Sequence, residues 1–167
     1  MKILTITMIF LSLTLNAAIF GFFFAWVCST MWGLDAADPR VAIEAMQAMN
    51  ASVRNAVFAP AFFGTPVALG LTAILLYIRS HHLSAAAFAG AAVTYFCLGL
   101  VLTMMVNVPM NEALAGVTVS GDAEEARRIW SDYSGRWQVW NQIRSIGSLT
   151  AFLLALAGVL RIDPRSI

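Results

Sequence analysis

The stretch "ILTITMIFLSLTLNAAIFGFFFAWVCSTMWGL", residues 3–34, contains no Asp, Glu, Lys or Arg. A helix of about 20 apolar residues crosses the hydrocarbon core of a membrane, so this run is long enough to span it. The run is also much longer than the ~7–15-residue apolar core of a cleaved signal peptide. The stretch therefore predicts a membrane-spanning helix that stays in the protein.

Three further apolar runs follow, and the composition of the whole chain agrees with them. Of its 167 residues, 60% are hydrophobic and 11% charged, and the mean hydropathy is +0.78. Soluble domains carry roughly a quarter charged residues. We therefore expect one all-α domain over residues 1–167, an integral membrane four-helix bundle with spans at about 4–31, 60–79, 84–107 and 143–161.

The connections after the first and third spans are long, and both are expected to contain additional helices. Asp38 is a suitable N-cap, and Pro39 fits a first helical turn. Asp122 is a second N-cap candidate, followed by two glutamates that favour a helix N-terminus. Because no proline follows until Pro164, one continuous helix over residues 124–160 is expected.

Small residues recur where helices would have to approach closely. The segment "AAAFAGAA" covers residues 85–92, and Gly147, Ala151 and Ala155 follow one another at four-residue spacing. Such seams predict tight packing between membrane helices.

The distribution of Lys and Arg predicts the orientation of the bundle. Lys2, Arg79, Arg161 and Arg165 lie on very short segments of one side, whereas the six arginines of the other side are spread over long, acid-rich connections. Cation density therefore places both termini in the cytoplasm, in a bacterial inner membrane. The raw count of cations favours the opposite orientation.

A polar and aromatic stripe precedes the last apolar run, in "WSDYSGRWQVWNQIRS", residues 130–145. On a helix its members fall within an arc of about 100°: Trp130, Tyr133, Trp137, Trp140, Asn141, Arg144 and Ser148. Interfacial Trp and Tyr anchors would explain the rings alone. A cation and an amide in the same arc favour a face that turns inward to a site, because a charge at membrane depth is costly unless it is paired or faces a cavity.

Two other segments offer polar side chains at a similar depth. Asn107 and Asn111 lie one turn apart around Pro109, which bends the helix and frees a carbonyl. We expect this pair at the membrane boundary, within reach of the fourth span. Asn50 and Arg54 belong to a mixed stripe in the first long connection.

Arg144 is expected to pair with a partner that offsets the desolvation of its charge. The candidates are Glu112, Asp35 and the amides of Asn107 and Asn111.

The residues that bind metals and cofactors are scarce. His81 and His82 share a short turn, and Cys28 and Cys97 lie inside apolar runs. We interpret the two histidines as solvated residues and the two cysteines as packing residues. We expect no metal and no cofactor. The sequence also lacks nucleotide-binding loops, catalytic triads and the basic patches that bind nucleic acids.

Three motifs resemble those of the anthrone-oxygenase-like membrane family: "EAMQAMN" at 44–50, "NVPMNEAL" at 107–114, and the Trp and Tyr pattern that ends in "WNQIR" at 140–144. With the four spans and the long outer connections, the resemblance covers nearly the whole chain. It implies a small integral membrane protein. In characterised fungal and polyketide-pathway members it implies a cofactor-free monooxygenase that converts anthrones to anthraquinones, while most bacterial members have no assigned function.

An anthrone is a carbon acid whose anion reduces O2 directly, so the resemblance implies a site that binds a flat aromatic and favours its anion. The candidate catalytic residues are Arg144, Asn111 and Glu112. Arg144 and the amides would stabilise the anion, and Glu112, or as second choice Asp132, would act as the base. The candidate ligand-binding residues are Trp130, Tyr133, Trp137, Trp140, Asn141, Asn107, Asn50 and Arg54.

Two classes of function remain open on the sequence. In the first, an outer-side pocket binds a lipophilic aromatic or quinone-like molecule, with or without oxygenation. In the second, the protein is a non-catalytic membrane scaffold or partner whose polar stripe packs its own helices. Both involve contact with membrane lipids, and a homo-oligomer is compatible with either. A cavity lined by Trp137, Asn141, Arg144, Asn107 and Asn111 would favour the first class, and mutual hydrogen bonding of these side chains without a void would favour the second.

Overall fold

A computed structural model describes residues 2–119 and 121–163 of the chain. These residues form helices and no strand, and four helices are long and apolar enough to cross a membrane: Lys2–Asp35, Phe58–Ile78, His82–Ala115 and Ala123–Val159. The predicted all-α membrane bundle is confirmed. Compared with the predicted spans, Lys2–Asp35 is a few residues longer, His82–Ala115 continues further at its C-terminal end, and Ala123–Val159 begins much earlier.

Two of these helical segments, Lys2–Asp35 and His82–Ala115, are divided by π-helical turns. The described elements, in chain order, are α1 (Lys2–Ala25), the π-turn η1 (Trp26–Thr30), α2 (Met31–Asp35), α3 (Pro39–Ser52), α4 (Phe58–Ile78), α5 (His82–Thr94), the π-turns η2 (Tyr95–Val101) and η3 (Thr103–Asn107), α6 (Val108–Ala115) and α7 (Ala123–Val159). The additional helices predicted in both outer connections are therefore present, and the helix predicted over 124–160 is confirmed as α7.

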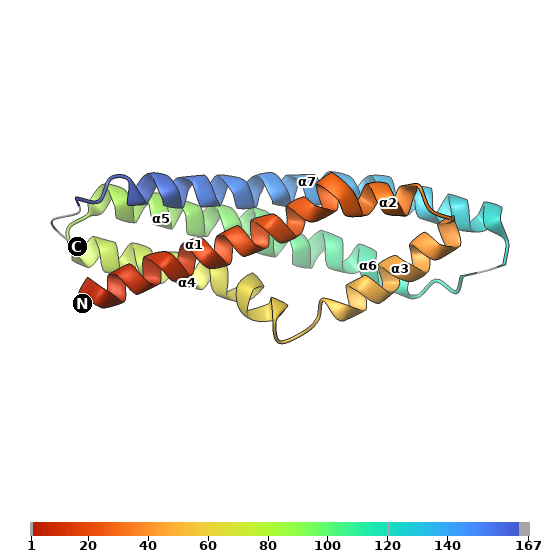
Figure 1. The fold of residues 1–167 in the computed structure, drawn as a ribbon, viewed down its shortest axis with the longest axis horizontal. Helices are drawn as coiled ribbons and strands as arrows, with labels where there is room; N and C mark the ends of the chain where they lie inside the picture. The colour runs from red at the N-terminus through yellow and green to blue at the C-terminus, as the bar shows by residue number, and fades with distance from the viewer. Residues whose placement is uncertain (1, 120, 164–167) are drawn as a thin grey trace.

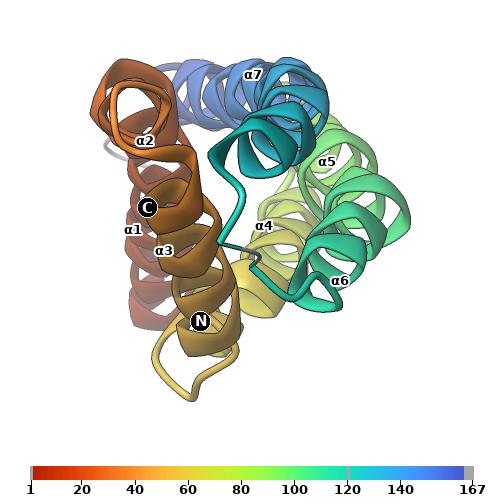
Figure 2. The same ribbon diagram turned by 90° about the vertical axis from the view of Figure 1, so that its right-hand side faces the viewer.

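The four long segments form a ring in which each packs against two neighbours. Helix α1 contacts α4 and α7, and α5 contacts the same two helices (Figures 1 and 2). The start of α1 and the end of α7 lie at the same end of the molecule (Figure 1). That this end faces the cytoplasm is still a prediction, and Arg165, one of the cations behind it, lies outside the described residues.

Helix α4 is the shortest of the four and indicates how deep the bundle sits in the membrane. Its 21 residues rise about 32 Å, close to the ~30 Å thickness of a hydrocarbon core. The outward face of α7 carries exposed Leu153, Ile146 and Val139, and then turns to exposed Arg136 and Asp132. A hydrocarbon core matched to α4 would therefore end near the N-terminal end of this helix, and α2, α3, α6 and the first half of α7 extend past that point (Figure 1).

Both predicted N-caps are present. The Asp38 carboxylate accepts a hydrogen bond from the Arg40 N–H at 2.9 Å, and the Asp122 carboxylate accepts one from the Glu124 N–H at 2.9 Å. The Arg40 side chain also donates to Asp38, and this hydrogen bond lowers the pKa of that carboxyl to about 2. The caps explain where α3 and α7 begin.

Two side chains tie the outer helices to each other. Gln47 on α3 donates to the carbonyls of Leu114 and Val117, at 2.8 and 2.9 Å, and so satisfies carbonyls at the end of α6. Asp35, at the end of α2, accepts hydrogen bonds from three groups on α7: Trp130 Nε1, Ser134 Oγ and Gln138 Nε2. These contacts join α3 to the end of α6, and α2 to the extended half of α7.

A proline inside α4 creates a polar contact within the core. Pro66 has no N–H, so the carbonyl of Phe62 one turn earlier lacks its helical donor. The hydroxyl of Tyr95, which is fully buried, donates to that carbonyl at 3.0 Å. Gly99 makes room for the Tyr95 ring, because a Cβ there would lie 2.7 Å from it. The Tyr95 hydroxyl thus satisfies the carbonyl that Pro66 leaves without a helical donor.

The predicted small-residue seam of α7 packs directly against the third span. Ala151 and Ala155 have no exposed surface. At Gly147 a Cβ would lie 2.5 Å from Cβ of Leu98. Since Leu98 Cβ is fixed to its backbone, the two helices could not keep this distance with any larger residue at position 147.

We expect Gly147→Ala to lower the free energy of unfolding by about 1–3 kcal/mol, because the added methyl overpacks the contact with Leu98. Gly135→Ala on the same helix is the matched control, since position 135 is open and loss of glycine there should stabilise the helix by about 0.5–1 kcal/mol. Thermal unfolding in detergent micelles measures both. Equal stability of the two variants would contradict the close approach.

Candidate functional site

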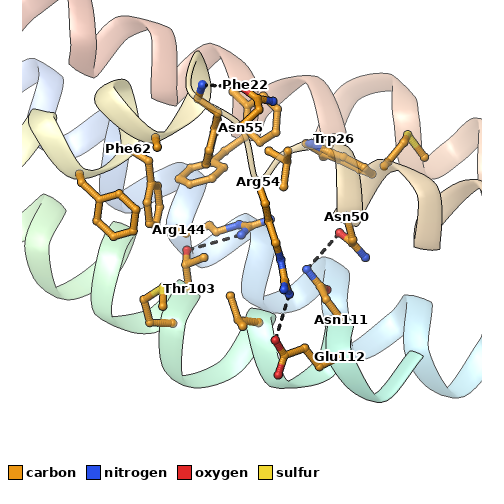
Figure 3. A pocket seen from close by; sticks show the side chains of 18 of the residues that line it. Phe22, Trp26, Asn50, Arg54, Asn55, Phe62, Thr103, Asn111, Glu112 and Arg144 are labelled. Carbon is orange, nitrogen blue, oxygen red and sulfur yellow. Dashed lines mark hydrogen bonds and ion pairs between the residues drawn. The ribbon is translucent and has the colours of Figure 1, made fainter. Parts of the chain in front are cut away.

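A cavity of about 610 Å³ lies where the long helices meet the outer helices, beside the N-terminal end of α4 (Figure 3). Its walls come from α1 and η1, the end of α3 with the following loop, α4, η3, α6 and α7. The lining residues are Phe22, Phe23, Trp26, Met49, Asn50, Val53, Arg54, Asn55, Ala56, Phe58, Ala59, Phe62, Phe63, Thr103, Met104, Val108, Asn111, Glu112, Trp137 and Arg144.

Aromatic rings make up much of the apolar wall. Phe22 and Phe58 lie with ring centroids 4.8 Å apart, and Phe58 stacks on Phe62 at 5.4 Å. On the α7 side Trp26 packs against Trp137 at 5.1 Å. Rings on several sides of one cavity give flat faces against which an aromatic ligand can pack.

The guanidinium of Arg144 reaches this wall from α7, and the residue is only 5% exposed. Its Nε donates to Asn141 Oδ1 at 2.9 Å, and its Nη1 is 3.5 Å from Thr103 Oγ1, a long contact. The guanidinium carbon lies 4.4 Å from the centroid of the Phe23 ring and 4.9 Å from that of Trp137. Asn141 donates in turn to the Phe23 carbonyl at 3.2 Å, which holds the whole group against α1.

Arg144 pairs with no carboxylate within residues 2–119 and 121–163, and its hydrogen bonds there go to Asn141 and Thr103 and not to Asn107 or Asn111, so the predicted partners are wrong. Glu112 binds Arg54 instead, at 3.0 Å. Asp35 accepts hydrogen bonds from Trp130, Ser134 and Gln138, all of which precede Arg144 on α7. The sequence could not show which of these candidates lies next to Arg144. That depends on which turn of α7 each connecting segment contacts, and the sequence does not give it.

Asn111 is the centre of a second polar group in the wall. Its Oδ1 accepts hydrogen bonds from the Tyr133 hydroxyl at 2.8 Å and from Trp137 Nε1 at 2.9 Å. Its Nδ2 donates to Asn50 Oδ1 at 3.0 Å (Figure 3). One side chain therefore joins α3, α6 and α7, and it fixes the indole of Trp137 next to Arg144.

π-helical turns shape two of the cavity walls. Trp26 begins η1, where the Met31 N–H bonds the Trp26 carbonyl five residues back. Thr103 begins η3, in which the Val108 N–H bonds the Thr103 carbonyl in the same way. Such insertions rotate the following residues around the helix and are frequent at functional sites. The proline predicted to disturb this segment, Pro109, follows the η3 turn directly.

The structure brings together about half of the predicted site residues. Six of them line the cavity: Arg144, Asn111, Glu112, Trp137, Asn50 and Arg54. Two stand one layer behind it and hold lining side chains, Asn141 behind Arg144 and Tyr133 behind Asn111.

Three predicted residues and the second-choice base lie elsewhere. Trp130 packs away from the cavity and binds Asp35. Trp140 is half-buried and does not line the cavity. Asn107 is fully buried outside the lining, and neither amide atom has a hydrogen-bond partner among the described residues. Asp132 is exposed and is not part of the wall.

Sequence reasoning missed the aromatic wall contributed by α1 and α4. The signal was present as "FGFFFAW" at residues 20–26 and "VFAPAFF" at 57–63. In a membrane span such runs are equally compatible with contact to lipid, so only the packing of the helices distinguishes Phe22 and Phe62, in the wall, from the exposed Phe24.

Comparison with known proteins gives one match. The family model described as anthrone oxygenase matches residues 54–154, more than half of the chain. The chain belongs to the anthrone oxygenase family. No curated protein and no solved structure matches it. The family match covers the part of the cavity formed by α4, η3, α6 and α7, including Arg144 and Asn111, whereas the walls from α1 and α3 lie before it.

A double-mutant cycle tests the hydrogen bonds that centre on Asn111. We expect Tyr133→Phe to destabilise the protein by about 1 kcal/mol in the native background. In the Asn111→Leu background it should cost close to nothing, because the hydroxyl has already lost its acceptor. Unfolding in detergent micelles measures all four proteins. Additive effects of the two substitutions would show that the contact contributes nothing.

Proposed function

We propose that the cavity binds a flat, lipophilic, acidic aromatic as its anion next to Arg144, and that the bound anion is oxygenated by O2 without a cofactor. The observation that carries the proposal is a buried guanidinium, without a carboxylate partner among the described residues, in the wall of an aromatic cavity.

The charges of the wall indicate the charge of the ligand. Three described lining residues are ionisable, and two of them, Arg54 and Glu112, neutralise each other. Arg144 is left as one net positive charge. Desolvating a cation costs several kcal/mol unless an opposite charge compensates it. A singly charged anion, such as a phenolate or enolate, matches this wall.

The size and the apolar lining of the cavity fit a polycyclic aromatic. Binding sites for small molecules typically measure roughly 300–1,000 Å³ and combine apolar walls with a few polar groups. The volume of about 610 Å³ lies within this range. The Phe22, Phe58 and Phe62 rings would pack against the ligand. The polar groups come from the end of α3 with the following loop, from η3, and from α6 and α7.

The oxygenation of an anthrone is balanced without any further electron donor. Conversion of the CH2 group to a carbonyl releases four electrons, and O2 takes up four. The first C–H proton passes to a base, and the resulting anion gives one electron to O2. The carbon radical and superoxide then combine through a new C–O bond, and protonation yields a hydroperoxide. Loss of the second proton with cleavage of the O–O bond leaves the carbonyl and releases water.

Several polar residues in and behind the wall have a role in this reaction. Arg144 stabilises the anion by its charge, which favours the first proton transfer. Glu112 is the proposed base, as the carboxylate among the described lining residues. Asn111 has one amide N–H beyond the one given to Asn50, and this N–H can bind a ligand oxygen. Asn141 and Thr103 act through Arg144 as positioning residues.

The scaffold alternative is favoured by one part of the stripe. Around Asp35, the side chains of Trp130, Ser134 and Gln138 satisfy one another and join α2 to α7. That half of α7 serves packing. The other half, with Trp137 and Arg144, borders a void, which a purely structural role does not require.

We expect Arg144→Leu to lower kcat/KM for a dihydroxyanthrone by at least about 100-fold, since the developing anion loses its counter-charge. Oxygen uptake and anthraquinone absorbance, measured in proteoliposomes, should rise in a one-to-one ratio in the native protein. Arg136→Leu is the matched control, because Arg136 is exposed on the same helix and does not line the cavity.

The control should keep native activity, and both variants should insert and fold. Native turnover by Arg144→Leu would contradict the role of the cation. No oxygen uptake by the folded native protein, with binding of the anthraquinone intact, would limit the function to binding.

A further inference from the structure

A second cavity, of about 460 Å³, lies between α1 and α4. It is lined by Ala18, Ile19, Phe22, Trp26, Met49, Ser52, Val53, Asn55, Val57, Phe58 and Ala61. No charged residue belongs to this set of described residues. The exposed Ala18 and Val57 place the cavity at the outer surface of the bundle, near the end of α4 where the helices leave the apolar region.

The two cavities share part of their walls. Phe22, Trp26, Met49, Val53, Asn55 and Phe58 line both, so a single layer of side chains separates them. In this layer the rings of Phe22 and Phe58 face each other at 4.8 Å, and both residues are only half-buried. Because side chains can change between staggered rotamers while the backbone stays in place, this pair is the part of the layer at which we expect the cavities to join.

The cavity that contains Arg144, called the ligand cavity below, has a charged and exposed side away from the cavity between α1 and α4. Arg54 and Glu112 form an ion pair there with side chains 59% and 60% exposed (Figure 3). A neutral, lipophilic aromatic concentrates in the hydrocarbon of a membrane, and leaving it for water costs about 25 cal/mol for each Å² of apolar surface. The charged side therefore suits water and protons, and the uncharged cavity between α1 and α4 suits the neutral aromatic.

We propose that the cavity between α1 and α4 is the entry site for the neutral form of the ligand, which arrives sideways from the membrane. The proposal rests on the proposed function of the Arg144 cavity. The ligand passes the Phe22–Phe58 layer, loses its proton next to Arg144, and is held there as the anion. The neutral product leaves by the same route, while the proton and water exchange on the Arg54–Glu112 side.

Ala18→Trp tests the route, because it fills the second cavity from an exposed position that does not line the first. Ala17→Trp is the matched control: this alanine is also exposed, is the neighbour of Ala18 on the helix, and lines neither cavity. Val57→Trp is a second plug from the opposite wall, at a residue that is 87% exposed.

Association is followed by stopped-flow absorbance in proteoliposomes with two probes. One is a hydroxyanthraquinone dissolved in the bilayer, and the other is an anthraquinone sulfonate, which stays in water. Both plugs should slow association of the lipid-dissolved probe about tenfold. They should leave its Kd and the association of the sulfonate close to the native values, and Ala17→Trp should change neither rate.

Three results would overturn the entry site. Native association of the lipid-dissolved probe in both plugged variants would exclude the route between α1 and α4, although the proposed function would stand. Equal slowing of both probes would show that the plugs disturb the ligand cavity itself. Failure of the native protein to bind either probe would overturn the proposed function, and the entry site with it.

Discussion

The buried guanidinium of Arg144 is the constraint on which the cavity depends. Taking a cation out of water costs several kcal/mol. Part of this desolvation cost is offset by the hydrogen bond to Asn141, the long contact with Thr103 and the interactions with the rings of Phe23 and Trp137. A cation over a ring contributes about 0.5–2 kcal/mol. No described carboxylate completes the compensation, and we therefore propose that an anion from outside the chain does so.

The rest of the fold can be understood as the support of this one group. Helix α7 is continuous, so Arg144 and the outer Trp130 face the same interior. Asn111 fixes the Trp137 indole, and Asp35 ties the outer half of the same helix to α2. The Gly147 seam brings α7 against the third span at a distance that no larger residue permits. Each contact limits the freedom of α7 to turn Arg144 towards water.

The sequence predicted α7 well, because its signals are local. The Asp122 cap, the absence of proline and the arc of Trp130, Trp137 and Arg144 all follow from neighbours along one helix. Trp140 does not line the cavity, because it lies at the edge of the arc, where a small rotation of the helix decides whether a side chain is buried. The partner of Arg144 and the rings of Phe22 and Phe58 depend on how separate helices meet. In addition, the π-turns shift the side chains after Trp26 and Thr103, and no hydrophobic period reveals such a shift.

The ionisation state of a bound acidic dye tests the central claim most directly. A hydroxyanthraquinone has different visible spectra as the neutral phenol and as the phenolate. Its spectrum can be recorded with the protein in proteoliposomes at a pH where the free dye is neutral. Our account predicts the spectrum of the phenolate on binding, because the uncompensated charge of Arg144 stabilises the anion. A bound dye with the spectrum of the neutral phenol would contradict it.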